Sequence, residues 1–109
     1  MPTSDHEGVV HEADLVIPAL RIMADRPGGF IATADLIPEL EEVFNPTGRD
    51  AEIIPDRSDT YFSQKVRNLV SHRGSPSSFI ATGFADYEDE RRGLKITESG
   101  RDLLARLGI

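Results

Sequence analysis

The chain has 109 residues, of which 39% are hydrophobic and 28% are charged, a composition that fits one domain with a hydrophobic core. It contains no cysteine, which excludes disulfides, thiolate metal sites and cysteine nucleophiles. The sequence has no apolar stretch of transmembrane length, and its first residues do not form a secretory signal. We therefore expect a cytoplasmic protein that does not bind membranes.

Charge is distributed unevenly along the chain. The net charge of −7 argues, on its own, against strong non-specific binding to nucleic acid. Residues 1–58 contain 12 acidic residues and 4 arginines, whereas residues 59–109 contain 7 acidic residues and 8 lysines and arginines. The net charge of the whole chain therefore hides a C-terminal half that is much less acidic.

The N-terminal region predicts a tail followed by a helix. Residues 1–11 are polar and without periodicity, and we expect one folded domain over residues 12–109. The first helix is expected to begin near Asp14 with Pro18 in its first turn, where a missing N–H is harmless. Residues 26–29, Arg-Pro-Gly-Gly, end it.

A short strand and a second helix come next. Residues 30–32 have the apolar character of a strand, and Thr33 is expected to cap a helix over residues 34–44. Pro38 interrupts the helical pattern, either as a kink or as the true first turn. The following residues, 45–58, are rich in proline, glycine and charge and predict a loop. Two isoleucines are expected to anchor this loop to the core, Ile53 and Ile54.

The second half predicts a helix, a hairpin and a last helix. The helix over residues 60–72 is expected to be capped by Asp59 or Ser58 and to end at the Gly-Ser-Pro segment. Residues 83–96 then read as strand, charged turn and strand. Thr97 caps the last helix, residues 98–107. Its apolar stripe is Leu103, Leu104 and Leu107, and Phe79 and Ile80 are expected to return to the core before the hairpin.

This order of elements is that of a winged helix-turn-helix. We therefore predict a mostly helical α+β fold with a three-helix core, a short strand, a β-hairpin wing and a C-terminal helix. In that fold the third helix enters the major groove of DNA and the hairpin forms the wing.

The third helix presents a polar face suited to DNA. Its apolar positions have the spacing of a buried stripe: Phe62, Val66, Leu69 and Val70. The opposite face carries no acidic residue after Asp59, and consists of Thr60, Gln64, Arg67, Asn68 and Ser71. Tyr61, Lys65 and His72 lie on one flank. Arginine can bridge a guanine edge, glutamine and asparagine an adenine edge, and the others can hold phosphates. A solvated polar face is the plainer alternative.

Further cations follow the third helix. Arg73 is placed to reach a DNA phosphate or the carboxyl end of a helix. The wing, residues 87–95, supplies Arg91, Arg92 and Lys95, which are suited to phosphates or to the minor groove. Acidic residues stand beside them: Asp86, Glu88, Asp89 and Glu90. An exposed turn whose charges pair internally is therefore an equal alternative for Arg91 and Arg92.

The sequence also resembles a known family. Residues 17–21, 59–73, 83–87 and 93–100 are similar to the winged-helix domains at the N-terminus of Mrr-type restriction endonucleases, and to similar domains joined to HNH nucleases. The resemblance covers about residues 14–107. It implies a duplex-DNA-binding specificity or regulatory module linked to restriction or defence. It assigns Gln64, Lys65, Arg67, Asn68 and Arg73 to the recognition helix, and Arg91, Arg92 and Lys95 to the wing. These 109 residues include no nuclease domain, so fragment, subunit and stand-alone regulator all stay open.

Nothing in the sequence indicates an enzyme. The nuclease pattern Asp/Glu-x-Lys is absent, because the residues two positions before the lysines are Ser63 and Gly93. Neither a glycine-rich phosphate loop nor a nucleophile elbow occurs. The three histidines, His6, His11 and His72, lack the spacing of metal ligands. We expect no metal and no cofactor.

The rival interpretation is an interaction protein without DNA binding. The acidic residues of the second helix, Asp35, Glu39, Glu41 and Glu42, are either a solvated surface, a docking face or a mimic of DNA phosphates. The partner would then be a nuclease, a repressor or a second copy. A homodimer would also give a weakly charged DNA-binding domain useful affinity, because it presents two helices at once.

Overall fold

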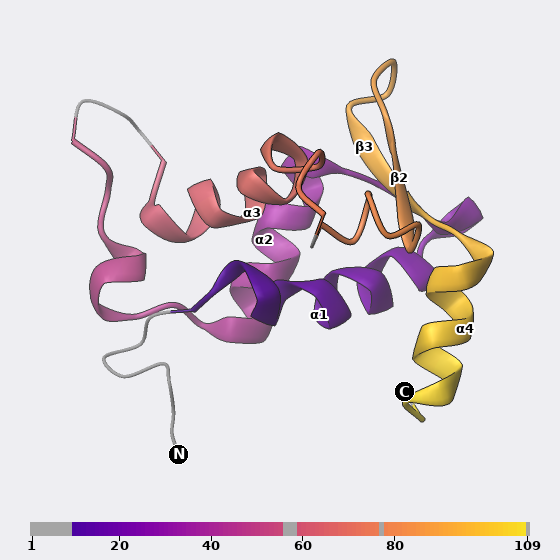
Figure 1. Ribbon diagram of the computed structural model, residues 1–109. Helices are drawn as coiled ribbons and strands as arrows, with labels where there is room; N and C mark the ends of the chain where they lie inside the picture. Colours follow the sequence, from indigo (N-terminus) through magenta and orange to yellow (C-terminus); the bar gives the residue numbers. More distant parts are fainter. Residues whose placement is uncertain (1–9, 56–58, 77, 109) are drawn as a thin grey trace.

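The computed structural model describes residues 10–55, 59–76 and 78–108, and within them it has an α+β fold (Figure 1). The helices are α1 (Glu12–Ala24), α2 (Thr33–Phe44), α3 (Tyr61–Ser71) and α4 (Glu98–Arg106). The strands are β1 (Phe30–Ala32), β2 (Ala85–Glu88) and β3 (Gly93–Ile96). They form an antiparallel sheet in the order β1-β3-β2, which places the hairpin strand β3 at the centre. The expected α+β class, the short strand and the hairpin are confirmed.

Helix α1 begins earlier than the proline suggests. The backbone N–H of His11 donates to the Asp14 carboxylate over 3.0 Å and fixes the first turn. Pro18 therefore lies inside the helix, where it leaves one carbonyl of the preceding turn without its usual donor. The prediction of Pro18 in the first turn is wrong. Val10 is buried, so packing begins within the expected tail, of which residues 1–9 lie outside the described residues.

Helix α2 follows β1 without a break. Thr33 is its first residue and Ala32 occupies the N-cap position, so the predicted Thr33 cap is off by one residue. Pro38 is again accommodated inside the helix. The chain leaves α2 through Asn45 in the left-handed conformation, with φ of 48°, which an asparagine tolerates better than most residues.

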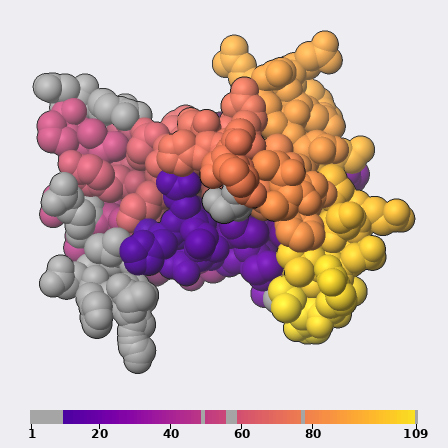
Figure 2. Space-filling view, in the orientation of Figure 1, coloured from indigo at the N-terminus to yellow at the C-terminus, as the bar shows by residue number. Residues whose placement is uncertain are grey.

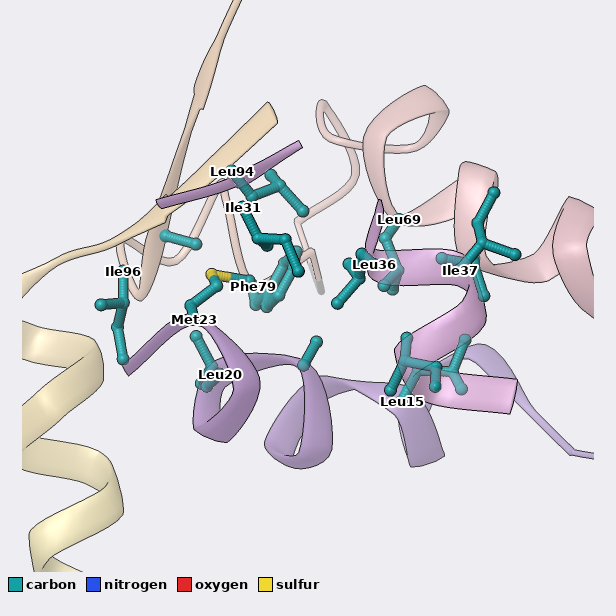
Figure 3. Packing of buried hydrophobic residues seen from close by; sticks show 14 of the residues in the cluster. Leu15, Leu20, Met23, Ile31, Leu36, Ile37, Leu69, Phe79, Leu94 and Ile96 are labelled. Atoms are coloured by element: carbon teal, nitrogen blue, oxygen red, sulfur yellow. The ribbon is translucent and has the colours of Figure 1, made fainter. Parts of the chain in front are cut away.

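The core lies between the helices and one face of the sheet (Figure 3). Helix α1 contributes Leu15, Leu20 and Met23, which meet Leu36 of α2 and Leu94 of β3. The predicted stripe of α3 is confirmed at Phe62, Val66 and Leu69, whereas Val70 is only partly buried and Ser63 is buried in addition. Phe79 returns to the core as expected, with Ile80 packed partly against it.

Two predicted core residues are exposed. Ile53 has 63% of its surface exposed, so it does not anchor the loop between α2 and α3. Leu107, at 52% exposure, lies beyond the end of α4, whose buried leucine is Leu104. Both errors arise because an apolar residue at a segment end carries no signal of which way the chain turns.

Candidate nucleic-acid interface

Helix α3 is started by a reciprocal cap. The backbone N–H of Ser63 donates to the Thr60 hydroxyl over 3.0 Å, and the backbone N–H of Thr60 donates to the Ser63 hydroxyl over 2.9 Å. Thr60 is therefore the cap in place of the predicted Asp59, and the alternative Ser58 lies outside the described residues. The Thr60 hydroxyl is occupied in holding the helix, which lowers its value as a DNA contact. Tyr61, in the first turn, is partly buried.

The outward face of α3 carries Gln64, Arg67 and Ser71, as the helical pattern predicts. The Arg67 side chain is 49% exposed, and its Nε atom lies 3.7 Å from a carboxylate oxygen of Asp59. That separation exceeds a hydrogen bond, so Arg67 is loosely paired. The Gln64 amide donates to Asn68 Oδ1 over 2.9 Å, and Gln64 is only partly exposed.

Glu12, at the start of α1, holds the flank of α3 nearest to it. Its Oε2 atom accepts a hydrogen bond from Asn68 over 3.2 Å, and its Oε1 atom lies 3.0 Å from His72 Nδ1. Asn68 and His72, two predicted DNA contacts, thus share the carboxylate of a residue in α1. The sequence analysis missed Glu12, because nothing local to residue 12 indicates a neighbour 56 or 60 positions away.

Lys65 is part of the folded framework. Its ammonium group lies 2.5 Å from Asp50 Oδ1 and donates to the carbonyl oxygen of Val10 over 2.6 Å. Asp50 is fully buried, and its other oxygen accepts from the Val10 backbone N–H over 2.6 Å. This Asp50–Lys65 pair ties Val10, just before α1, and the α2–α3 loop to α3. We therefore remove Lys65 from the candidate interface.

Arg73 joins the end of α3 to the hairpin. Its guanidinium donates to the carbonyl oxygen of Val70 over 2.9 Å, which is the expected contact with the carboxyl end of a helix. The same group lies over the ring of Tyr87 in β2, 5.0 Å from the ring centroid. Arg73 is exposed and contacts both the end of α3 and strand β2.

The cations of the hairpin differ in whether other residues of the chain engage them. Arg91 stacks on Phe30 of β1 at 3.8 Å and pairs with Glu88 at 2.6 Å, so the internally paired alternative holds for Arg91. Arg92 is exposed at the turn with φ of 51°, and its carbonyl accepts from the Thr33 backbone N–H. Lys95 lies on the outer face of the sheet. Neither Arg92 nor Lys95 forms an ion pair with another described residue.

The hairpin and α3 lie on the same side of the molecule, and α4 with the C-terminus lies on the other (Figure 1). In the space-filling view the hairpin tip stands above the surrounding surface, with the segment after α3 beside its base (Figure 2). Of the predicted contacts, Arg67, Ser71, Arg73, Arg92 and Lys95 are exposed, whereas Lys65, Asn68, His72 and Arg91 are engaged by other residues of the chain.

No group of three or more potential metal ligands occurs among the described residues. No helix in residues 10–55, 59–76 or 78–108 is both long and apolar enough to cross a membrane. Comparisons with protein-family models, with curated proteins and with solved structures give no match.

Proposed function

We propose that this chain is a winged-helix module that binds duplex DNA, with α3 in the major groove and the β2–β3 hairpin against the backbone. The observation that carries the proposal is the face of α3 opposite its core stripe, formed by Gln64, Arg67 and Ser71, in a helix that lies on the same side of the molecule as the hairpin (Figure 1). The sheet order β1-β3-β2, with the hairpin after the third helix, supports the assignment of the hairpin as a wing.

The dimensions and energies of α3 suit this role. Its 11 residues extend over about 16 Å, and the major groove, about 12 Å wide, admits one helix. The loose pair between Arg67 and Asp59 is exposed, and such pairs contribute only about 0–1 kcal/mol. A bidentate contact from arginine to guanine contributes about 1–3 kcal/mol of discrimination. Giving up the pair with Asp59 therefore costs little beside the discrimination that a base contact would supply.

Phosphate contacts fall to the exposed cations of this region that form no ion pair with another described residue. Arg73, Arg92 and Lys95 occupy the end of α3 and the hairpin, and we assign them to the DNA backbone. The proposed link to restriction or another defence system rests on the resemblance of residues 14–107 alone. The experiment that tests DNA binding is a fluorescence anisotropy titration of labelled random-sequence duplex with the full chain, followed by a search for a preferred site that includes methylated duplexes.

Replacing Arg92 with asparagine is expected to weaken binding to all duplexes and to reduce the salt slope by about one unit, as loss of one phosphate contact does. Asparagine tolerates the left-handed backbone of this turn, so the hairpin keeps its shape. Arg91→Gln is the matched control. Because Arg91 is stacked and paired, its loss should change the slope by much less. Equal slopes for both variants would remove Arg92 from the interface.

Replacing Glu12 with glutamine is expected to raise DNA affinity roughly threefold to tenfold. The change removes a negative charge that lies against Asn68 and His72 and that DNA phosphates would approach. Glutamine has the same shape, so the contacts to α3 are kept. Asp102→Asn on α4 is the control for net charge, with little expected effect. Anisotropy at one fixed salt concentration measures both, and an affinity of Glu12→Gln no higher than that of Asp102→Asn would contradict the placement of Glu12 at the interface edge.

A further inference from the structure

A chain of side-chain hydrogen bonds runs along one stripe of α3 and ends on α1. Gln64, Asn68 and the C-cap residue His72 are each one helical turn apart, so they follow one another on the same face. The Gln64 Nε2 atom donates to Asn68 Oδ1 over 2.9 Å, and Asn68 Nδ2 donates to Glu12 Oε2 over 3.2 Å. The other carboxylate oxygen, Glu12 Oε1, lies 3.0 Å from His72 Nδ1.

The Glu12 carboxylate fixes the direction of the bonds in this chain. An ionised carboxylate only accepts hydrogen bonds, whereas a side-chain amide donates from its nitrogen and accepts at its oxygen. Asn68 must therefore turn its nitrogen toward Glu12, and this turns its oxygen toward Gln64. Gln64 can meet that oxygen only with its own nitrogen. In the same way, His72 must carry a proton on Nδ1 to donate to Glu12.

We propose that Glu12 is a positioning residue for base recognition, which acts through Asn68 and makes Gln64 read adenine. This inference rests on the proposed binding of α3 in the major groove. The glutamine amide is planar, so donation to Asn68 through Nε2 fixes the side of the amide that bears Oε1. An amide that turns both an N–H and an oxygen toward a base matches N7 and N6 of adenine. The reversed amide would turn only its nitrogen toward the base, which matches the two acceptors of guanine.

The two orientations of the Gln64 amide differ in the hydrogen bonds that they allow. A reversed Gln64 would face Asn68 Oδ1 with its own oxygen, and the bond between them would be lost. Turning Asn68 as well would move the same conflict to Glu12, which cannot donate. Loss of one such bond corresponds to roughly tenfold in an equilibrium constant. We therefore expect the unmodified chain to prefer A·T over G·C by about tenfold at the base pair that Gln64 contacts.

The experiment compares duplexes that differ in one base pair. The preferred duplex is first selected with the unmodified chain, and Gln64→Ala identifies the position at which the preference is lost. Fluorescence anisotropy then gives the ratio of the affinities for A·T and G·C at that position. Glu12→Gln should reduce this ratio to less than about threefold, because a glutamine amide can donate or accept and so supports both directions of the chain. Its affinity for random-sequence duplex should rise, since a negative charge is removed.

Asn68→Ala separates the direction of the hydrogen bonds from the charge. It breaks the chain between Glu12 and Gln64 but keeps the carboxylate, so the ratio should fall as it does in Glu12→Gln while the affinity for random-sequence duplex stays within about threefold. Asp102→Asn, at an exposed position of α4, is the control for net charge and should keep the ratio of the unmodified chain. A loss of folded protein lowers both affinities by the same factor, so it does not change the ratio.

The outcomes separate this inference from the proposed function. A ratio that stays unchanged in Glu12→Gln or in Asn68→Ala would overturn the inference and leave DNA binding intact. A preference for G·C at the position that Gln64 contacts, or no position whose preference depends on Gln64, would do the same. Absence of binding by the unmodified chain to every duplex would instead overturn the proposed function, and this inference with it.

Discussion

Replacing Arg67 with glutamate is expected to weaken binding to the preferred duplex by at least about 100-fold, or roughly 2.7 kcal/mol. The change removes the base contact and places a carboxylate where the DNA lies, next to Asp59. The side chain is half exposed on the outward face of α3, so the fold should survive. Fluorescence anisotropy measures the affinity, and circular dichroism checks the fold.

The matched control for this variant is Arg106→Glu in α4. It changes the net charge by the same amount, but α4 lies on the side of the molecule away from the hairpin (Figure 1). We expect a loss of only a few fold, from long-range repulsion. If Arg67→Glu bound as tightly as Arg106→Glu, the assignment of α3 to the major groove would be wrong.

Replacing Lys65 with methionine is expected to lower the free energy of unfolding by about 3 kcal/mol, because it leaves the buried Asp50 carboxylate without its cation. Urea denaturation followed by circular dichroism measures the loss. Adding Asp50→Asn should recover most of it, since the amide is neutral and its oxygen still accepts from Val10.

This pair of variants also tests the role of Lys65. If Lys65 contacted a phosphate, Lys65→Met would lower the affinity for DNA and leave the free energy of unfolding unchanged. If Lys65 instead holds the fold together, Lys65→Met lowers the free energy of unfolding by a large amount and does not act through a lost DNA contact. A decrease below about 0.5 kcal/mol would show that Asp50 is not a buried, paired charge in solution.

Local signals account for most of the fold. The helical spacing of Phe62, Val66 and Leu69 locates α3, and the charged turn between two strand patterns locates the hairpin. The ends of elements were predicted less well, because they depend on single contacts. Pro18 suggested the first turn of a helix that begins near Asp14, but the contact from His11 to Asp14 begins α1 at Glu12 and leaves Pro18 in its interior.

The candidate site was predicted in part, since its chemistry depends on distant partners. The outward position of Arg67 follows from helical periodicity alone. The engagement of Lys65 by Asp50, of His72 by Glu12 and of Arg91 by Phe30 does not, because these partners are brought close only by packing. An apolar residue, Ile53, was expected to anchor the α2–α3 loop, and a buried carboxylate does so instead.

The measurement that tests DNA binding most directly is a salt titration of the unmodified chain with random-sequence duplex DNA, from low to physiological salt. Three phosphate contacts, from Arg73, Arg92 and Lys95, predict that the logarithm of the binding constant falls with the logarithm of salt with a slope of about −3. Absence of binding at the lowest salt would contradict the proposed function and would favour an interaction protein that acts through its acidic half.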